Sequence, residues 1–368
     1  MNRKICFVAL SSLPLLTSSE TLKYVGGSEL KQVLIGRELV KRGFQINFIT
    51  YDENSEKEKT DEITIIKSFS PSKNFSALKI ALMIWKSLKK ANADIYFKGS
   101  EYAGIIPFFC ITHRKKYVKW IGSDSDLLFE RFRSTHPILL KITVLIDIKF
   151  ANRIIVQNLF QKELIEKKFK KKCVLIKNPV VILDNGKIKN KENKNNILWV
   201  GTIRPVKQPE IFLKIAQSLP KLKFLMIGGE SEEGKKLFND IEREANTISN
   251  LEFLGFVPHH KIQKYYEEAS LFINTSQIEG FPNTFLEAWI NSTPVISLSV
   301  DPDEIICKKK LGLHSKTLQQ LILDIKTIMS NDNLRKEMGI NGKKYVEQNH
   351  DLKKIADQFE KLISSFEN

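Results

Sequence analysis

The sequence lacks any pattern of paired cysteines. It has only four, Cys6, Cys110, Cys173 and Cys307, and no two of them form a C-x-x-C pair. This argues against a zinc site and against a disulfide framework. Scattered unpaired cysteines are typical of proteins in a reducing compartment, so we expect a cytoplasmic location.

The sequence also lacks a hydrophobic run long enough to cross a membrane, which takes about 18–20 uncharged apolar residues. The closest segment, residues 138–150, is shorter and contains three charged residues. At the start of the chain, basic residues precede the apolar stretch 5–10, but Pro14 follows and no small-residue cleavage site closes the stretch. We therefore expect a first buried strand rather than a signal peptide, and no integral membrane segment.

Acidic residues are scarce in the first half of the chain. Residues 1–190 hold 34 Lys and Arg against 18 Asp and Glu, whereas residues 191–368 hold 24 of each. The first half therefore carries the whole formal net charge of +16. Such an imbalance indicates an anionic partner: nucleic acid, an anionic membrane or a phosphorylated substrate. No zinc-finger spacing or RNA-binding aromatic motif accompanies the charge, which argues against nucleic acid.

The chain of 368 residues is long enough for two domains. Short β-branched and aromatic runs alternate with amphipathic segments in both halves, which predicts two parallel-sheet α/β domains. The expected strands are residues 5–10, 45–50, 94–97, 117–121, 153–157, 174–177, 197–200, 223–227, 251–254, 271–274 and 295–298. The polar segment 184–196 is typical of a linker. We predict domains over 1–183 and 197–350, and a C-terminal helix over 351–368 that packs back on the first domain.

The strongest local signal is the segment 279–289, EGFPNTFLEAW. Glu279 and Glu287 lie eight residues apart around a Gly-Phe-Pro turn, between a predicted strand and a predicted helix. Backbone N–H groups near Asn283 and Thr284 would then lie at the positive end of the helix dipole and form an anion cradle. Thr284 and Glu287 also fit a capping box, so a capped helix start with one surface glutamate is the alternative.

With these residues the sequence resembles the retaining glycosyltransferases of family 4, which have the GT-B fold. The E-x7-E segment, followed by a helix and by Thr293-Pro-Val-Ile, is characteristic of that family. Further segments agree in the family's order, namely residues 25–29, 39–44, 151–158, 178–179, 200–207 and 227–229. The resemblance covers nearly the whole chain. It implies two Rossmann-like domains that face each other across a cleft, in a bacterial glycan or lipopolysaccharide-type transferase.

The resemblance also implies roles for single residues. Gly27 would let the backbone approach the donor diphosphate closely, because it has no Cβ, and Lys207 would neutralise that diphosphate. Glu279 would contact hydroxyls of the transferred sugar near the reacting carbon. Glu287 would hold the ribose hydroxyls.

Two positions depart from the family's pattern. Thr202 stands where the family has an arginine, and we expect Arg204 to take over the phosphate contact, which a guanidinium makes bidentately. Ile121 stands where many members have a histidine near the donor sugar. Asp124 is the nearest polar candidate for touching the sugar or acceptor, although it fits a helix cap equally well. The histidines at 259–260 are expected to be surface loop residues.

The resemblance implies a UDP- or GDP-sugar donor, transfer of a hexose or N-acetylhexosamine, and a glycan or lipid-linked acceptor in cell-surface polysaccharide synthesis. With no evident nucleophile, we expect same-face displacement, in which the protein supplies positioning and charge. We expect no metal and no cofactor. The sequence has D-x-D patterns at 124–126 and 301–303, but neither lies where a metal-binding D-x-D motif would be expected.

Three other interpretations remain open. The chain could be a sugar-nucleotide epimerase or an inactive protein of the same fold, because Ile121 stands where many family members have a histidine. A nicotinamide oxidoreductase is disfavoured, because the first glycine loop, GGSE, lacks G-x-G-x-x-G. A nucleic-acid-binding protein is the most distant alternative.

The basic half contains a cationic amphipathic segment, residues 76–90, which includes Trp85. Such a helix suits an anionic bilayer surface, and the alternative is an ordinary helix packed on the sheet with its lysines in water. Because the first domain of the resembling family binds the acceptor, we expect peripheral attachment at the cytoplasmic face of the inner membrane.

Overall fold

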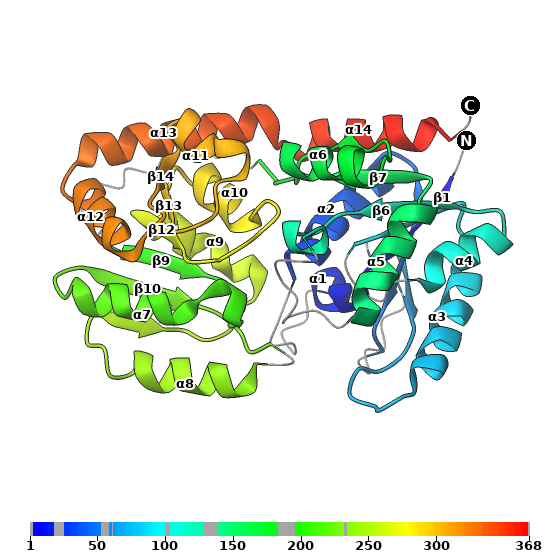
Figure 1. The fold of residues 1–368 in the computed structure, drawn as a ribbon, viewed down its shortest axis with the longest axis horizontal. Helices are drawn as coiled ribbons and strands as arrows, with labels where there is room; N and C mark the ends of the chain where they lie inside the picture. Colours follow the sequence, from blue (N-terminus) through cyan, green and yellow to red (C-terminus); the bar gives the residue numbers. More distant parts are fainter. Residues whose placement is uncertain are drawn as a thin grey trace. The chain divides into compact units, whose positions relative to one another are not determined.

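A computed structural model of the chain describes residues 3–17, 26–52, 59–60, 62–99, 104–128, 138–182, 196–231 and 234–366. These residues form two compact units: unit 1 combines the chain up to Pro179 with the residues from Leu352 on, and unit 2 spans residues 180–351. Each unit contains a largely parallel sheet with helices around it (Figure 1), which confirms the predicted fold class. The predicted linker, 184–196, lies outside the described residues except for its last residue, where a strand begins.

Unit 1 is built on an eight-stranded sheet in the order β3-β4-β2-β1-β5-β6-β7-β8, parallel except between β3 and β4. Its strands are β1 (Lys4–Val8), β2 (Gln45–Thr50), β3 (Lys59–Thr60), β4 (Ile63–Lys67), β5 (Ile95–Lys98), β6 (Lys116–Trp120), β7 (Arg153–Val156) and β8 (Val174–Leu175). The central strand β1 pairs with β2 on one side and β5 on the other, so the strand order reverses there. In parallel sheets the loops beyond such a switch point are a common place for ligands.

The helices of unit 1 are α1 (Leu13–Thr17), α2 (Gly27–Lys41), α3 (Ala77–Ala91), α4 (Ile105–Thr112), α5 (Ile138–Phe150), α6 (Leu159–Lys168) and α14 (Leu352–Ser364). The last of these comes from the far end of the chain. Its apolar face, including Ile355 and Phe359, is buried in the same core as the strands. Arg42, just after α2, donates to Asp357 at 2.6 Å and to Glu360 at 2.9 Å. Apolar burial and these ion pairs together attach α14 to unit 1.

Unit 2 contains a six-stranded parallel sheet in the order β11-β10-β9-β12-β13-β14. The strands are β9 (Asn196–Val200), β10 (Lys223–Ile227), β11 (Leu251–Phe253), β12 (Leu271–Asn274), β13 (Val295–Ser297) and β14 (Gly312–His314). The helices are α7 (Pro209–Ser218), α8 (Lys235–Ala245), α9 (His259–Glu268), α10 (Asn283–Ile290), α11 (Ile305–Lys308), α12 (Leu318–Met329) and α13 (Asp332–Asn349), with a short 3-10 turn η3 (Pro205–Lys207) after β9. Strands β9, β10, β12 and β13 are apolar except for one polar residue at an end, which is typical of strands covered on both faces.

Helix α10, which carries one of the two motif glutamates, is held by close packing against α13. A Cβ on Gly339 would lie 2.2 Å from the carbonyl oxygen of Ser292, and one on Gly342 would lie 2.6 Å from the Trp289 indole. Only glycine permits such an approach. The indole N–H of Trp289 also donates to the carbonyl of Leu311 at 3.1 Å. These contacts fix the position of α10 against the rest of unit 2.

Candidate functional site

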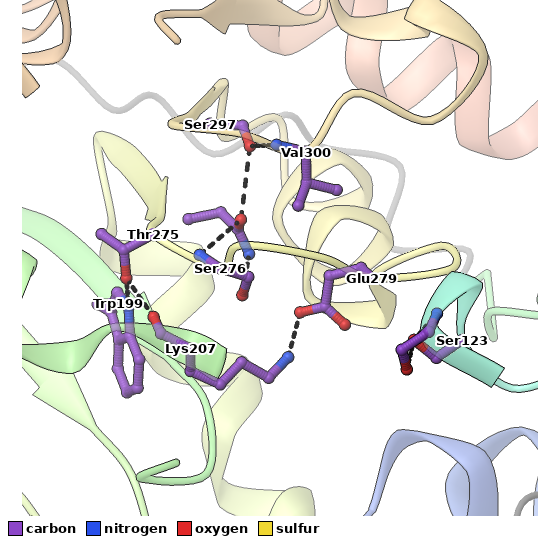
Figure 2. A network of polar contacts seen from close by, with 10 residues as sticks. Ser123, Trp199, Lys207, Thr275, Ser276, Glu279, Ser297 and Val300 are labelled. Carbon is purple, nitrogen blue, oxygen red and sulfur yellow. Dashed lines mark hydrogen bonds and ion pairs between the residues drawn. The ribbon is translucent and has the colours of Figure 1, made fainter. Parts of the chain in front are cut away.

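The loop that carries Lys207 is attached to the carboxyl end of the neighbouring strand, β12. The buried hydroxyl of Thr275 accepts the indole N–H of Trp199 at 2.9 Å and donates to the carbonyl of Lys207 at 2.6 Å. The backbone N–H of Gln277 donates to the carbonyl of Val206 at 2.9 Å. These bonds tie η3, which follows β9, to the loop that leads from β12 to Glu279 (Figure 2). Since β9 and β12 are adjacent and parallel, both loops leave the same edge of the sheet.

A buried polar cluster lies at the base of the loop that leads from β12 to Glu279. The Asn274 side chain donates to the Ser276 hydroxyl at 3.2 Å and accepts the backbone N–H of Ser276 at 3.2 Å. The Ser297 hydroxyl donates to the same amide oxygen at 3.4 Å and accepts the backbone N–H of Val300 at 3.2 Å (Figure 2). Buried polar groups that are satisfied in this way favour one backbone conformation. The cluster therefore fixes where the loop begins.

The structure brings Lys207 and Glu279 into contact. The ammonium group of Lys207 donates to Oε1 of Glu279 in an ion pair between the two loops (Figure 2). The side chains are 26% and 17% exposed, so the pair is partly shielded but open to solvent. A cation and a carboxylate fixed side by side form a site able to bind both a phosphate and sugar hydroxyls.

Glu287, on α10, contacts a histidine instead of capping its helix. Its Oε1 lies 2.8 Å from Nε2 of His259, the first residue of α9. Burial lowers the pKa of His259, but the hydrogen bond to Glu287 and its charge outweigh burial, so the pKa lies above its usual value. Burial, and next the nearby Glu287 carboxylate, raise the pKa of Tyr266 well above its usual value. Glu287 is thus a partly buried carboxylate, 19% exposed, in contact with the imidazole of His259.

Helix α10 begins at Asn283, and its preceding residue, Pro282, provides no side-chain cap. Asn283 and Thr284 therefore occupy the first turn, where the helix dipole favours an anion. The alternative of a capping box formed by Thr284 and Glu287 is wrong. Arg204 lies three residues before Lys207, immediately before η3, and is partly exposed.

The two remaining predicted site residues belong to unit 1. Gly27 is the exposed first residue of α2. Asp124 does not cap a helix: its Oδ1 accepts hydrogen bonds from the side-chain amides of Asn158 at 3.1 Å and Gln161 at 2.8 Å. Ser123 provides the cap of that turn instead. The roles that the resemblance implies for Gly27 and Asp124 stay predictions.

Two residues of the site were not expected from the sequence. His259 is neither in a loop nor fully at the surface, so the prediction of a surface loop histidine is wrong for it. Its partner lies 28 positions away along the chain, and no local spacing links the two. Thr275 follows a predicted strand directly, and a polar residue at the carboxyl end of a buried parallel strand was the available signal.

In each of the two D-x-D patterns, one carboxylate is bonded to nearby backbone N–H groups. Asp126 accepts the backbone N–H groups of Gly122 and Ser123, each at 3.1 Å. Asp301 accepts the backbone N–H of Ile306 at 2.8 Å. Within the described part of the chain, no group of three or more His, Cys, Asp or Glu side chains is placed to hold a metal ion. Metal independence stays a prediction.

Comparisons with known proteins support the fold. Residues 183–345 match the family model of glycosyl transferases group 1. An uncharacterized glycosyltransferase of Haemophilus influenzae is 23% identical over 356 residues, covering 92% of this chain and 96% of that protein. Sucrose-phosphate synthase of Thermosynechococcus elongatus has a TM-score of 0.81 at 16% identity, and 98% of each chain is covered. Anabaena HepE, solved with UDP and glucose, has a TM-score of 0.77 at 16% identity, over 99% of this chain and all of that one. Residues 183–345 are therefore similar to the glycosyl transferases of group 1, and the chain has the GT-B fold of these solved structures.

Proposed function

We propose that the chain transfers a hexose or N-acetylhexosamine from a UDP- or GDP-sugar to a glycan or lipid-linked acceptor, with retention of anomeric configuration. The observation that carries the proposal is the contact between Lys207 and Glu279 on two loops at one edge of a parallel sheet. The complex of the similar Anabaena HepE with UDP-glucose supports a nucleotide-sugar donor. Membership in family 4 and a role in cell-surface polysaccharide synthesis are part of the proposal.

In this reaction Lys207 neutralises the diphosphate as it leaves. A diphosphate carries more negative charge than the single carboxylate of Glu279, so it attracts the ammonium group strongly. Arg204 adds a bidentate phosphate contact, and the first turn of α10, at Asn283 and Thr284, donates backbone N–H groups to phosphate oxygens. Together these groups stabilise the charge that develops on the leaving group.

The glutamates hold the sugars. Glu279 accepts hydrogen bonds from hydroxyls of the transferred sugar, while Glu287 accepts them from the ribose. The bond between the anomeric carbon and the phosphate oxygen breaks, and the acceptor oxygen bonds the same face of that carbon. The acceptor proton passes to a phosphate oxygen of the leaving diphosphate. The residues supply positioning and electrostatics rather than a covalent intermediate.

The proposal is tested by following the product directly. The purified chain is incubated with nucleotide sugars and candidate acceptors, and NMR reports the anomeric configuration of the new linkage and any free diphosphate. We expect an axial donor to give an axial product, with activity retained in EDTA. Epimerised donor without transfer would identify an epimerase. An inverted product, or loss of all activity in EDTA, would contradict the proposed mechanism.

We expect His259 to govern how pH affects donor binding. Its imidazolium bonds Glu287 and holds that carboxylate for the ribose. Because the folded pKa of His259 is raised, the charged pair is complete below about pH 6.5 and is lost as pH rises through the raised pKa. Nucleoside diphosphate affinity should fall across the same window.

Titration calorimetry of UDP and GDP at several pH values measures this effect. His259→Ala should weaken binding about tenfold at low pH, as expected for a hydrogen bond between charged groups. His259→Gln should flatten the pH dependence, and His260→Ala serves as a neighbouring control. If His259→Ala weakens binding equally in a Glu287→Gln background, His259 does not act through Glu287.

A further inference from the structure

Unit 1 exposes an unusual number of large apolar side chains on three of its helices. They are Leu78 and Leu82 on α3, Phe108 and Ile111 on α4, and Ile142, Leu145 and Phe150 on α5. Leu78 is 73% exposed and Leu82 55%. Single exposed apolar residues are ordinary, but a group of them on neighbouring elements marks an interaction surface. We call these seven residues the apolar face.

The helices that carry the apolar face are in contact with one another. Leu78, Leu82 and Trp85 follow a helical spacing that places them on one stripe of α3. Trp85 makes an edge contact with Phe109 of α4, with ring centroids 5.1 Å apart. Phe108, the next residue of α4, lies against Phe150 of α5 at 6.0 Å between ring centroids. Helices α3 and α4 pack on each other, as do α4 and α5 (Figure 1), so the seven residues lie on three adjoining helices.

The charge around the apolar face has one sign. Helix α3 contains four lysines and no acidic residue, and α4 contains no charged residue. The one acidic residue of α5, Asp147, is buried and bonded to Lys98. The exposed basic residues on α3, after α4 and on α5 are Lys79, Lys86, Lys89, Lys90, Arg114, Lys116 and Lys149. The nearby exposed acid, Asp94, pairs with Lys115 at 3.6 Å.

We propose that the apolar face binds the surface of an anionic phospholipid bilayer. Apolar side chains on three helices, with lysines on α3 and α5, suit the boundary between acyl chains and anionic headgroups. The described helices include none that is long and apolar enough to span a membrane, so the chain lies on the surface. A second copy of the chain fits poorly, because a twofold interface would place like charges opposite each other. The proposal goes beyond the proposed function, and it does not depend on which nucleotide sugar the chain uses.

Vesicle flotation tests the proposal on the full chain. Vesicles of phosphatidylcholine alone are compared with vesicles containing 30% phosphatidylglycerol, at low and high salt. We expect binding at least about tenfold stronger to the anionic vesicles, and weaker at high salt, because each lysine near an anionic surface contributes a factor of about five. Equal binding to both vesicles, or to neither, would overturn the proposal.

Matched variants locate the surface. Leu78→Ser with Leu82→Ser, and separately Phe108→Ser with Ile111→Ser, should each reduce binding at least about fivefold. Lys86→Gln, Lys89→Gln and Lys90→Gln together should reduce it at least about tenfold. The controls are Leu323→Ser, which changes a 54% exposed leucine on α12, and the triple variant Lys221→Gln, Lys235→Gln and Lys236→Gln. If the controls weaken binding as much as the face variants, the proposed location is wrong.

Nucleotide binding and gel filtration complete the design. Every variant should keep the nucleoside diphosphate affinity of the wild type, which separates this inference from the proposed function. The contrary outcome is a wild type that fails to bind vesicles and instead forms a dimer that Leu82→Ser abolishes. In that case the apolar face would be an interface between two copies of the chain, and the membrane proposal would be overturned.

Discussion

Replacing Lys207 with alanine is expected to lower kcat/KM for sugar transfer by about a factor of 10²–10³, the range found when one preorganised charge-stabilising group is removed. The loop stays in place, because the Thr275 hydroxyl and the backbone bond between Gln277 and Val206 hold it without the lysine side chain. What is lost is the cation that faces the leaving diphosphate. Both partners of the Lys207–Glu279 pair are partly exposed, so we expect little change in stability.

Steady-state kinetics with thermal unfolding of the same samples measure this result. Lys221→Ala, which removes an exposed lysine before β10, is the matched control and should leave kcat/KM unchanged. A Lys207→Ala enzyme within threefold of the wild type would show that Lys207 does not stabilise the transition state. A large loss shared with Lys221→Ala would indicate a general effect of charge on the protein.

Replacing Asp147 with alanine should lower the free energy of unfolding of unit 1 by about 3–5 kcal/mol, the usual cost of removing one partner of a buried ion pair. Asp147 is fully buried and accepts from the ammonium of Lys98 at 2.8 Å, while the ammonium of Lys119 lies 3.7 Å away. Lys98 and Lys119 are neighbours in register at the ends of β5 and β6. Without the carboxylate, two buried cations would face each other uncompensated.

Urea unfolding followed by circular dichroism measures this loss. Glu163→Ala, which breaks an exposed i, i+4 pair with Lys167, should cost at most about 0.5 kcal/mol. A midpoint for Asp147→Ala equal to that of Glu163→Ala would show that the buried pair contributes nothing.

The Asp147 carboxylate also sets a lower pH limit on the stability of unit 1. Burial alone would raise the pKa of Asp147, but the charges of Lys98 and Lys119 hold it below its usual value. A depressed carboxylate contributes its stability above the unfolded pKa, near 3.9, and loses it as pH falls through the folded value. Unit 1 of the wild type should therefore lose stability below about pH 4.

The sequence was sufficient to predict the two parallel α/β units and most of their strands. Buried parallel strands are apolar runs, and β2, β10 and β12 appear where that pattern predicted them. The missed strands have physical reasons. Strand β4 follows the charged segment 52–62, and β14 has only three residues, beginning at a glycine. Strand β14 forms no apolar run long enough to indicate a strand, whereas β4 has a run of four β-branched residues that was missed directly after the charged segment.

The sequence predicted several residues of the site, but it did not predict the contacts between them. Lys207 and Glu279 were each chosen from local motifs, and their ion pair joins positions 72 apart. Local spacing predicts which loops leave a sheet edge, whereas the contact depends on the order β9-β12 of strands distant in sequence. His259 was missed for the same reason.

The most direct test of the central claim is a thermal-shift screen of the wild type against a panel of nucleotide sugars and nucleoside diphosphates, repeated on Glu279→Ala and Glu287→Ala. Ligands that bind only the folded state raise the melting temperature, and at a fixed concentration the tighter ligand raises it more. We expect at least one UDP- or GDP-sugar to stabilise the wild type. Glu287→Ala should weaken the binding of both the nucleotide sugar and its parent nucleoside diphosphate. Glu279→Ala should weaken mainly the binding of the nucleotide sugar. If no nucleotide sugar stabilised the wild type, the assignment of this site to a nucleotide-sugar donor would be contradicted.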